Sequence, residues 1–471
     1  MNIIDEIRSR ATQQPHHPAL ICDQGSDKPA QIISYVELVE RMDIFADRLR
    51  QSHCNRGDRV GLLSPQGTEF IVAGLGILAA ELCFVPISDD YDGDALEGFI
   101  KRTQLHHLIR QTNELQIQHL PEAGAVDGQN DEAFRALQPA YIRFTSGTTN
   151  ERKGVIIGHQ AILDRLENAN QALNIGPADK VMWMLPMAHH FVVSILLYLR
   201  YGATILLPRS YLAKPVLEFA NAHAASVFYA SPYHYDSLAK DVSGLGLPQV
   251  RLAVSTASGL SIDVAKRFFA RMEVPLSQAL GVIEVGLPVI NTMRAMEKPL
   301  SLGQVLPAYD VWLRGDDGLP VPKGEKGEVC IRGKGIFDAY MAPWKPASEI
   351  MGDAGFCTGD QGYFDEDCDL ILCGRRSNRI NMAGMKFFAE EVEAIINAHP
   401  LVDESRVYGQ SHPHLGEIPM AQVVPSDLDR PPSSSDLTTL CKERLAAHKV
   451  PFNFELAAQL ERTSTGKIKR W

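Results

Sequence analysis

The sequence predicts an α/β protein with a large N-terminal domain and a small C-terminal domain. Its 471 residues are 45% hydrophobic and 22% charged, a balance typical of folded globular proteins and not of disordered chains. Short apolar runs alternate with helical patterns through most of the chain, which favours helices packed on largely parallel sheets. After Val305, turns containing Gly and Asp separate shorter strands, as in antiparallel sheets.

The N-terminal elements follow one another as strand, helix and strand. A strand is expected over 59–63, a helix with a buried face over 69–80, and a strand over 83–87. This order is typical of parallel sheets whose strands are joined by helices. The pattern continues with a strand over 141–144, a helix over 161–173, and strands over 204–207 and 226–229 with a helix between them.

The C-terminal elements are shorter and lie between polar turns. Strands are expected over 311–314, 328–332 and 370–373. A compact α/β unit begins after Gly374-Arg375, so the domains are predicted to span 1–374 and 375–471. In the C-terminal domain, one helix is expected over 390–398 and ends before Pro400. A second is expected over 437–447 and is capped by Asp436.

Composition excludes several classes of protein. A net charge of −11 disfavours nucleic acid as a general partner. The eight cysteines include no CxxC pair, so reduced, mostly buried thiols are expected, without a disulfide framework or zinc site. The N-terminus lacks the pattern of a secretory signal. The apolar runs 70–80 and 191–199 fall short of the roughly 20 residues that span a bilayer, so a cytoplasmic protein without a membrane span is expected.

The segment from Phe144 to Val155 has the composition of a phosphate-binding loop between a strand and a helix. Hydroxyls and backbone N–H groups in such a loop can surround phosphate oxygens, and a lysine adds positive charge. It is not a Walker A loop, because Arg152 precedes its lysine and Gly154 follows it. An ordinary polar turn could have the same composition. The candidate phosphate-binding residues are Thr145, Ser146, Gly147, Thr148, Thr149 and Lys153.

Three further segments carry reactive side chains. Asp360, in Thr358-Gly359-Asp360, and Arg375 suit the hydroxyls of a sugar, although each alone could be a turn or ion-pair residue. Lys467 follows a glycine near the C-terminus, where a flexible loop could deliver it to a site or a solvated basic tail could end the chain. Glu284 lies in the apolar run 278–286, where it could coordinate a cation or cap a helix.

Together and in this order, these segments resemble the motifs of the adenylate-forming superfamily, which includes acyl- and aryl-CoA synthetases, stand-alone adenylation domains and firefly luciferase. The resemblance extends from Tyr35 to Arg470. The matching segments are 145–155 (TSGTTGxPKGV), 327–333 (GELxVRG), 358–360 (TGD), 374–375 (GR), 448–451 (YKxP) and 463–470 (PxTxSGKIxR).

This resemblance implies an N-terminal domain of mixed, largely parallel sheets plus a small distorted barrel, and a mobile α+β C-terminal domain. It implies that a carboxylate attacks the α-phosphorus of Mg-ATP and that a thiol then attacks the acyl-adenylate. By position, Lys467 would bind the substrate carboxylate and the α-phosphate. Glu284 would hold Mg²⁺, Thr145–Thr149 and Lys153 the β- and γ-phosphates, Asp360 and Arg375 the ribose, and Ser377 would be the hinge.

Two departures concern the nucleotide. Leu280 stands where the superfamily has a tyrosine that stacks on adenine, and Ile283 stands where a threonine contacts the AMP phosphate. A lost phosphate contact would cost on the order of 1–3 kcal/mol. The sequence therefore leaves open a degenerate protein that only binds nucleotide or acyl groups.

The acyl pocket is expected near the segment 185–191, where His189 matches a His or aromatic residue of the superfamily. Val192 replaces a common glycine and would narrow the pocket, which suits an aryl acid or a short- to medium-chain fatty acid. Members of the superfamily that activate amino acids have an Asp near this segment, which binds the α-ammonium group of the substrate. An amino acid is disfavoured here because this stretch has no Asp before Asp236. The acceptor thiol would belong to CoA or to a carrier-protein phosphopantetheine. The expected pocket residues are His189, Val192, Ser258, Gly259, Ala279, Leu280 and Gly281.

Overall fold

The computed structural model describes residues 2–25, 28–88, 91, 93–111, 115–120, 128–144, 153–352, 355–462 and 468–470. The chain divides into two compact units. The first comprises Met1–Gly147, Glu151–Asp310 and Arg332–Phe356, and the second contains Val311–Ile331 and Cys357–Trp471. Thr145, Ser146, Gly147, Thr148, Thr149 and Lys467 lie outside the described residues.

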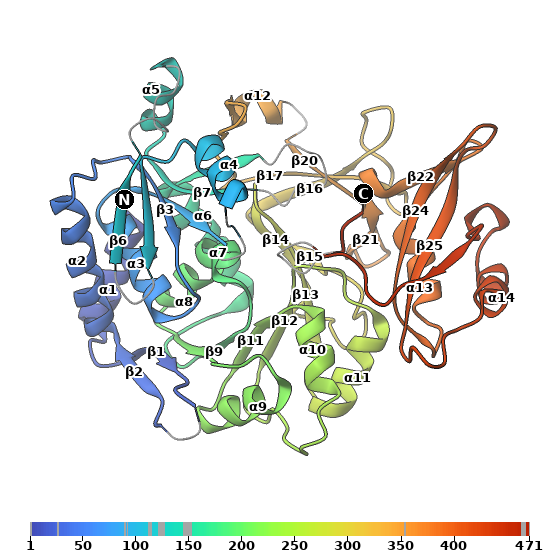
Figure 1. Ribbon diagram of the computed structural model, residues 1–471, viewed down its shortest axis with the longest axis horizontal. Helices are drawn as coiled ribbons and strands as arrows, with labels where there is room; N and C mark the ends of the chain where they lie inside the picture. Colours follow the sequence, from blue (N-terminus) through green and yellow to red (C-terminus); the bar gives the residue numbers. More distant parts are fainter. Residues whose placement is uncertain are drawn as a thin grey trace. The chain divides into compact units, whose positions relative to one another are not determined.

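The first unit contains an eight-stranded sheet (Figure 1). Its central strands pair in parallel and its outer strands antiparallel. The expected strands at 59–63 and 83–87 are confirmed. The order is β19 (Lys345–Pro346), β18 (Ala339–Tyr340), β8 (Gly154–Gly158), β7 (Pro139–Phe144), β4 (Cys83–Ile87), β3 (Arg59–Leu63), β5 (His107–Gln111) and β6 (Leu115–His119).

A nine-stranded sheet forms the rest of the unit, again with parallel strands in the middle. The strands expected at 204–207 and 226–229 are β10 and, shifted by one residue, β11. The order is β15 (Gln304–Val305), β14 (Gly286–Ile290), β13 (Leu276–Val282), β12 (Leu252–Ser255), β11 (Val227–Ala230), β9 (Lys180–Trp183), β10 (Thr204–Leu207), β1 (Pro18–Cys22) and β2 (Gln31–Ser34).

Helices supply the apolar faces that cover these sheets. One core cluster joins β9–β13 to three neighbouring helices, seen together in green in Figure 1: α9 (Ala213–Ala222), α10 (Pro232–Ala239) and α11 (Ile262–Met272). The helix expected over 69–80 is α3 (Thr68–Ala79), in which Phe70–Ala79 are all buried. The remaining helices of the unit are α1 (Ile3–Gln13), α2 (Tyr35–Gln51), α4 (Gly93–Thr103), α5 (Gly128–Ala136), α6 (His159–Leu173), α7 (Met187–His190), α8 (Leu196–Arg200) and α12 (Ala347–Met351).

The second unit contains two smaller sheets. The region after Val305, which was expected to contain short antiparallel strands, includes a four-stranded sheet in the order β16 (Tyr309–Arg314), β17 (Gly327–Gly333), β20 (Phe356–Phe364) and β21 (Leu370–Arg375). The other sheet has the order β23 (Met385–Phe388), β22 (Arg379–Met382), β25 (Gly416–Pro425) and β24 (Val402–His412), with β26 (Phe454–Leu456) beside β25. It packs against α13 (Ala389–Ile396) and α14 (Ser434–Arg444) around one core.

Two expectations about this unit were wrong. The start of α14 is capped by Ser433, not Asp436, because the Ser433 hydroxyl accepts a hydrogen bond from the Asp436 backbone N–H. The cysteines are not all free thiols. Cys330 on β17 and Cys357 on β20 form a disulfide because these strands are neighbours in the sheet, with Cα atoms 4.1 Å apart.

Within the described residues, no helix is both long enough and apolar enough to cross a bilayer. The apolar run 191–199 is instead a π-helical turn, Phe191–Ile195, followed by α8.

Candidate functional site

Glu284 lies in the turn between β13 and β14, and a buried arginine on α6 holds this turn. Arg165 donates hydrogen bonds to the carbonyls of Ile283 (2.7 Å), Glu284 (2.8 Å) and Gly335. Arg165 is only 2% exposed, and burial lowers its pKa to about 10, so it stays protonated at neutral pH. Three carbonyls thus satisfy a buried cation and fix the backbone that presents Glu284.

Tyr340 on β18 joins two of the predicted site residues. Its hydroxyl donates a 2.8 Å hydrogen bond to Glu284 Oε1, and the Lys153 ammonium lies 4.9 Å from the centre of its ring. Burial, and then the negative charge of Glu284, raise the pKa of Tyr340, so it remains a donor. Lys153 and Glu284, far apart in the sequence, therefore meet on one aromatic side chain.

Sequence reasoning missed both Arg165 and Tyr340. A signal for Arg165 was present, since it shares a helical face with Ile162, Leu166 and Ala169, all of which are buried. Tyr340 gave no signal, because its position depends on the pairing of β18 with β8, two strands distant in the sequence.

The strands on either side of the predicted phosphate loop are held in register. Phe144 at the end of β7 lies opposite Gly154 at the start of β8. A Cβ atom at Gly154 would lie 2.7 Å from the Phe144 ring, so only glycine fits there without a shift. Lys153, next to this glycine, is exposed.

In the second unit, Asp360 and Arg375 face each other across β20 and β21. Arg375 Nε donates a 2.8 Å hydrogen bond to Asp360 Oδ1, and the carboxylate is buried while the arginine is half exposed. Thr358 Oγ accepts a hydrogen bond from the Asp360 N–H and donates one to the Val329 carbonyl. The pair presents an acceptor and several donors, which suits vicinal hydroxyl groups.

Ser377, the predicted hinge, lies in a short 3₁₀-helix, Arg376–Asn378, directly after β21. It is exposed, and its hydroxyl donates to Asn378 Oδ1. Just before this helix, a Cβ atom at Gly374 would lie 2.5 Å from Glu390 Oε2, so any side chain there would require the Glu390 carboxylate to move.

His189 and Val192 lie at the junction of α7 and the π-helical turn. The Tyr141 hydroxyl donates to the Ala188 carbonyl (3.3 Å), and Gln66 Oε1 accepts from the Met187 N–H (3.0 Å). Val192 is buried. π-Helical turns are rare and are often found at functional sites.

Aromatic side chains that the sequence reasoning did not single out lie beside this segment. Tyr229 on β11 stacks on Trp183 of β9, with ring centres 5.7 Å apart and planes 7° apart. It also forms T-shaped contacts with His190 and Tyr198, whose ring centres lie 6.3 and 6.4 Å from its own. These four rings form a wall at the ends of β9 and β11.

The other expected pocket residues differ in how deeply they are buried. Ala279 and Leu280 on β13 are buried. Gly281, at the end of the same strand, is exposed, as are Ser258 and Gly259 in the turn after β12. A Cβ atom at Gly281 would lie 3.7 Å from Thr256 Oγ1, so the two strand ends are adjacent.

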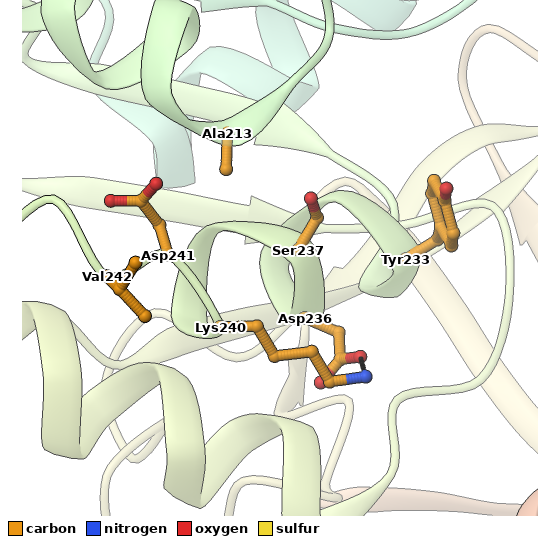
Figure 2. A pocket seen from close by; sticks show the side chains of 7 residues that line it. All are labelled: Ala213, Tyr233, Asp236, Ser237, Lys240, Asp241 and Val242. Carbon is orange, nitrogen blue, oxygen red and sulfur yellow. Dashed lines mark ion pairs between the residues drawn. The ribbon is translucent and has the colours of Figure 1, made fainter. Parts of the chain in front are cut away.

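A separate surface pocket of about 390 Å³ lies over α10 (Figure 2). Asp236, its central acid, forms a 2.6 Å ion pair with Lys240 and a second ion pair with Arg267. Because Asp236 already pairs with two cationic side chains, the structure does not support a role for it in binding the ammonium group of an amino acid. The lining residues are Ala213, Tyr233, Asp236, Ser237, Lys240, Asp241 and Val242, none of them a predicted site residue.

Most of the chain is similar to known protein families and enzymes. Residues 7–341 match the AMP-binding enzyme family, and residues 391–467 match the AMP-binding enzyme C-terminal domain. A 2-succinylbenzoate–CoA ligase from Bacillus licheniformis is 26% identical over 98% of both chains. A feruloyl-CoA synthase from Amycolatopsis sp. is 25% identical, covering 98% of this chain and 96% of that protein. A long-chain-fatty-acid–CoA ligase from Yersinia pestis is also 25% identical, covering 100% and 93%.

Solved structures share the fold. ATP-bound MatB from Rhodopseudomonas palustris superposes with a TM-score of 0.85 at 23% identity, covering 100% of this chain and 97% of that one. The o-succinylbenzoate CoA synthetase from Bacillus subtilis, in complex with its acyl-adenylate intermediate, superposes with a TM-score of 0.83 at 22% identity, covering 99% and 96%.

Proposed function

Because the chain belongs to the AMP-binding enzyme family, within the adenylate-forming superfamily, we propose that it activates a carboxylic acid with ATP and transfers the acyl group to the thiol of CoA. The observation that carries this proposal is the meeting of Lys153 and Glu284 on Tyr340. Lys153 supplies a positive charge and Glu284 a carboxylate at the predicted phosphate loop. This combination suits the phosphates of a nucleoside triphosphate and the metal ion that accompanies them.

In the first step, a carboxylate oxygen of the acid attacks the α-phosphorus of ATP, and the bond to the β-phosphate breaks. Acyl-adenylate and pyrophosphate are formed. Lys153 would bind the β- and γ-phosphates, and Lys467 would neutralise charge that develops between the carboxylate and the α-phosphate. Such fixed charges stabilise a transition state more than they stabilise the separated reactants.

In the second step, the thiol sulfur attacks the acyl carbon, the thiol proton is lost, and AMP leaves. The family resemblance assigns Asp360 and Arg375 to the ribose, and their ion pair supports this role, since the pair offers both acceptors and donors. Ser377 would be the hinge about which the C-terminal part of the chain turns between the steps.

Glu284 fits the magnesium ion that accompanies ATP. Magnesium is usually held by one or two carboxylates together with substrate phosphates and water. Glu284 offers such a carboxylate, half buried and held by Arg165 and Tyr340. Among the described residues, no group of three or more His, Cys, Asp or Glu side chains could form a metal site of its own. Bound magnesium would neutralise charge on the phosphates.

The acid is proposed to be an aryl acid or a short- to medium-chain fatty acid. The wall of Trp183, His190, Tyr198 and Tyr229 and the buried Val192 support a bounded, mainly apolar pocket. Relatives named for both aryl and fatty acids are equally similar to this chain. Their names also support CoA as acceptor, with a carrier-protein phosphopantetheine as the alternative thiol.

The deciding experiment measures pyrophosphate release from Mg-ATP with a panel of aryl, fatty and amino acids, first without a thiol and then with CoA. Release that depends on one class of acid, followed by AMP and thioester formation on adding CoA, is the expected result. Folded protein that binds ATP but releases no pyrophosphate with any acid would instead identify a nucleotide-binding protein without this activity.

A further inference from the structure

Arg143 lies on the face of β7 that is turned towards the candidate acyl pocket. Successive side chains of a strand point to opposite faces, so Arg143 shares a face with Tyr141. The Tyr141 hydroxyl bonds to the carbonyl of Ala188, the residue before His189. The face that carries Arg143 is therefore the one packed against α7.

Strand register places Arg143 on the same face as Tyr340. Arg143 is opposite Val155 in β8, and Val155 is opposite Tyr340 in β18. Directly paired residues of neighbouring strands point to the same side of a sheet. The next residue in each strand supports this assignment, because Ile142, Ile156 and Ala339 all belong to the apolar core on the opposite face.

Arg143 is half-buried, and its guanidinium is not held by an ion pair within the described part of the chain, although the Glu284 carboxylate is near enough to raise its pKa. No carboxylate in that part of the chain forms an ion pair with it, and its Nε is buried without a hydrogen-bond partner. The neighbouring buried arginines of this unit are satisfied, Arg59 by Asp131 and Arg165 by three carbonyls. A half-buried cation whose Nε has no hydrogen-bond partner carries a desolvation cost, and a bound anion would reduce that cost.

The surroundings of Arg143 favour the acid over the nucleotide as the source of that anion. Burial lowers the pKa of Arg143, and the nearby groups that act in the opposite direction are Tyr141, Glu284 and Tyr229. Tyr229 belongs to the aromatic wall of the candidate acyl pocket. Lys153, next to the start of the neighbouring strand, is the cation that the family resemblance assigns to the phosphates.

Resting on the proposed function, we infer that Arg143 binds a second carboxylate on the substrate, so that the preferred acid is a dicarboxylic acid. A guanidinium binds a carboxylate through two parallel hydrogen bonds, which gives both affinity and orientation. The second carboxylate, held by Arg143, would leave the first free to attack ATP.

The test uses pairs of acids that differ only in the second carboxylate: benzoate with benzene-1,3-dicarboxylate, and butanoate with pentanedioate. Acid-dependent pyrophosphate release is measured for the wild type, Arg143→Met and Arg143→Lys. The wild type is expected to favour a dicarboxylate by about 10-fold or more in kcat/KM, since an unmatched buried charge is costly. Arg143→Met should lose this preference, and Arg143→Lys should keep part of it.

Two controls separate this role from a structural one. Arg110→Met removes a positive charge from β5 of the same sheet and should leave the preference intact. The thermal midpoint of Arg143→Met should be unchanged or higher, because an apolar side chain replaces a half-buried charge that forms no ion pair with the described residues.

Three results would overturn the inference. If the wild type preferred the monocarboxylates and Arg143→Met kept this preference, Arg143 would not contact the acid. If Arg143→Met instead had an increased KM for ATP with every acid, Arg143 would be assigned to the nucleotide. In both cases the proposed function stands, whereas the absence of pyrophosphate release with any acid would reject the proposed function itself.

Discussion

Single residues decide how the charged groups of the first unit are held. Glu284 was predicted from the sequence, but its position depends on Arg165, which binds the backbone of the turn, and on Tyr340, which binds the carboxylate. Arg143 differs from Arg165 because it forms no ion pair with a carboxylate in the described part of the chain, and its Nε is buried without a hydrogen-bond partner. We therefore give the two cations of this unit different tasks: the buried Arg165 a structural one, and the half-buried Arg143 one directed at a ligand.

The variant Tyr340→Phe tests the link between Glu284 and Lys153. It removes the hydroxyl that bonds to Glu284 and keeps the ring beneath Lys153. A hydrogen bond to a charged group is worth about 1.5–3 kcal/mol, so kcat/KM for adenylation should fall about 10- to 100-fold. Tyr340→Ala, which also removes the ring, should lose more. Wild-type rates in Tyr340→Phe would mean that the hydroxyl does not position Glu284 for the reaction.

At the scale of elements, neighbouring strands bring together residues that are distant in the sequence. β20 and β21 align Asp360 with Arg375, and β17 and β20 align Cys330 with Cys357. The disulfide precedes Thr358-Gly359-Asp360 directly, so it anchors the strand that carries the predicted ribose-binding acid. The spacing of the cysteines along the chain does not indicate this pair, because strand order decides it.

The disulfide is tested by counting thiols. Unfolded, unreduced protein should titrate with six thiols and fully reduced protein with eight. A Cys330→Ser/Cys357→Ser variant should give six in both states and lose about 2–4 kcal/mol of stability, the usual effect of removing a disulfide. As a control, Cys368→Ser should lower each count by one. Eight thiols before reduction would show that Cys330 and Cys357 are free.

At the scale of the whole molecule, two half-buried histidines should make the fold sensitive to acid. Burial lowers the pKa of His106 to about 4 and that of His234 to about 4. Both rings accept hydrogen bonds through Nδ1, His106 from the Arg59 N–H and His234 from Ser231. The unfolded chain has histidine pKa values near 6.5, so between about pH 4 and pH 6.5 it binds more protons than the folded chain does. The free energy of unfolding should therefore fall as the pH drops from about 6.5 towards 4.

Urea unfolding at pH 7 and pH 5 measures this effect. His234→Gln should remove about 1–2 kcal/mol of the loss in stability between the two pH values, because glutamine does not titrate. His16→Gln, a change at an exposed position, serves as the control and should leave the loss unchanged. Equal losses in wild type and His234→Gln would mean that His234 does not contribute to acid sensitivity.

The two steps of the proposed reaction should separate in Lys467→Ala. Adenylation should fall by about 100-fold or more, because a fixed charge at the reacting phosphorus is lost. Thioester formation from supplied acyl-adenylate should remain within about 3-fold of wild type, because Lys467 is expected to leave the site before that step. Lys469→Ala provides a matched control, since Lys469 pairs with Glu461. Undiminished adenylation in Lys467→Ala would refute the role given to Lys467.

The sequence by itself determined the fold class, several of the strands and helices, and the family. Apolar runs and their periods depend on neighbouring residues, so 59–63, 83–87 and 204–207 were predicted with the bounds that the structure has. The motifs around Lys153, Glu284, Asp360 and Arg375 were likewise visible, because each is a short segment with its own chemistry.

Only the tertiary structure decided which of these residues meet and what holds them. Tyr340 reaches Glu284 because β18 pairs with β8, Arg165 reaches the turn because α6 packs beside β14, and Cys330 meets Cys357 because β17 and β20 are neighbours. The same pairing aligned Arg143 with Tyr340 across β8. Strand order and helix packing arise from the burial of the whole core, and no short stretch of sequence contains that information.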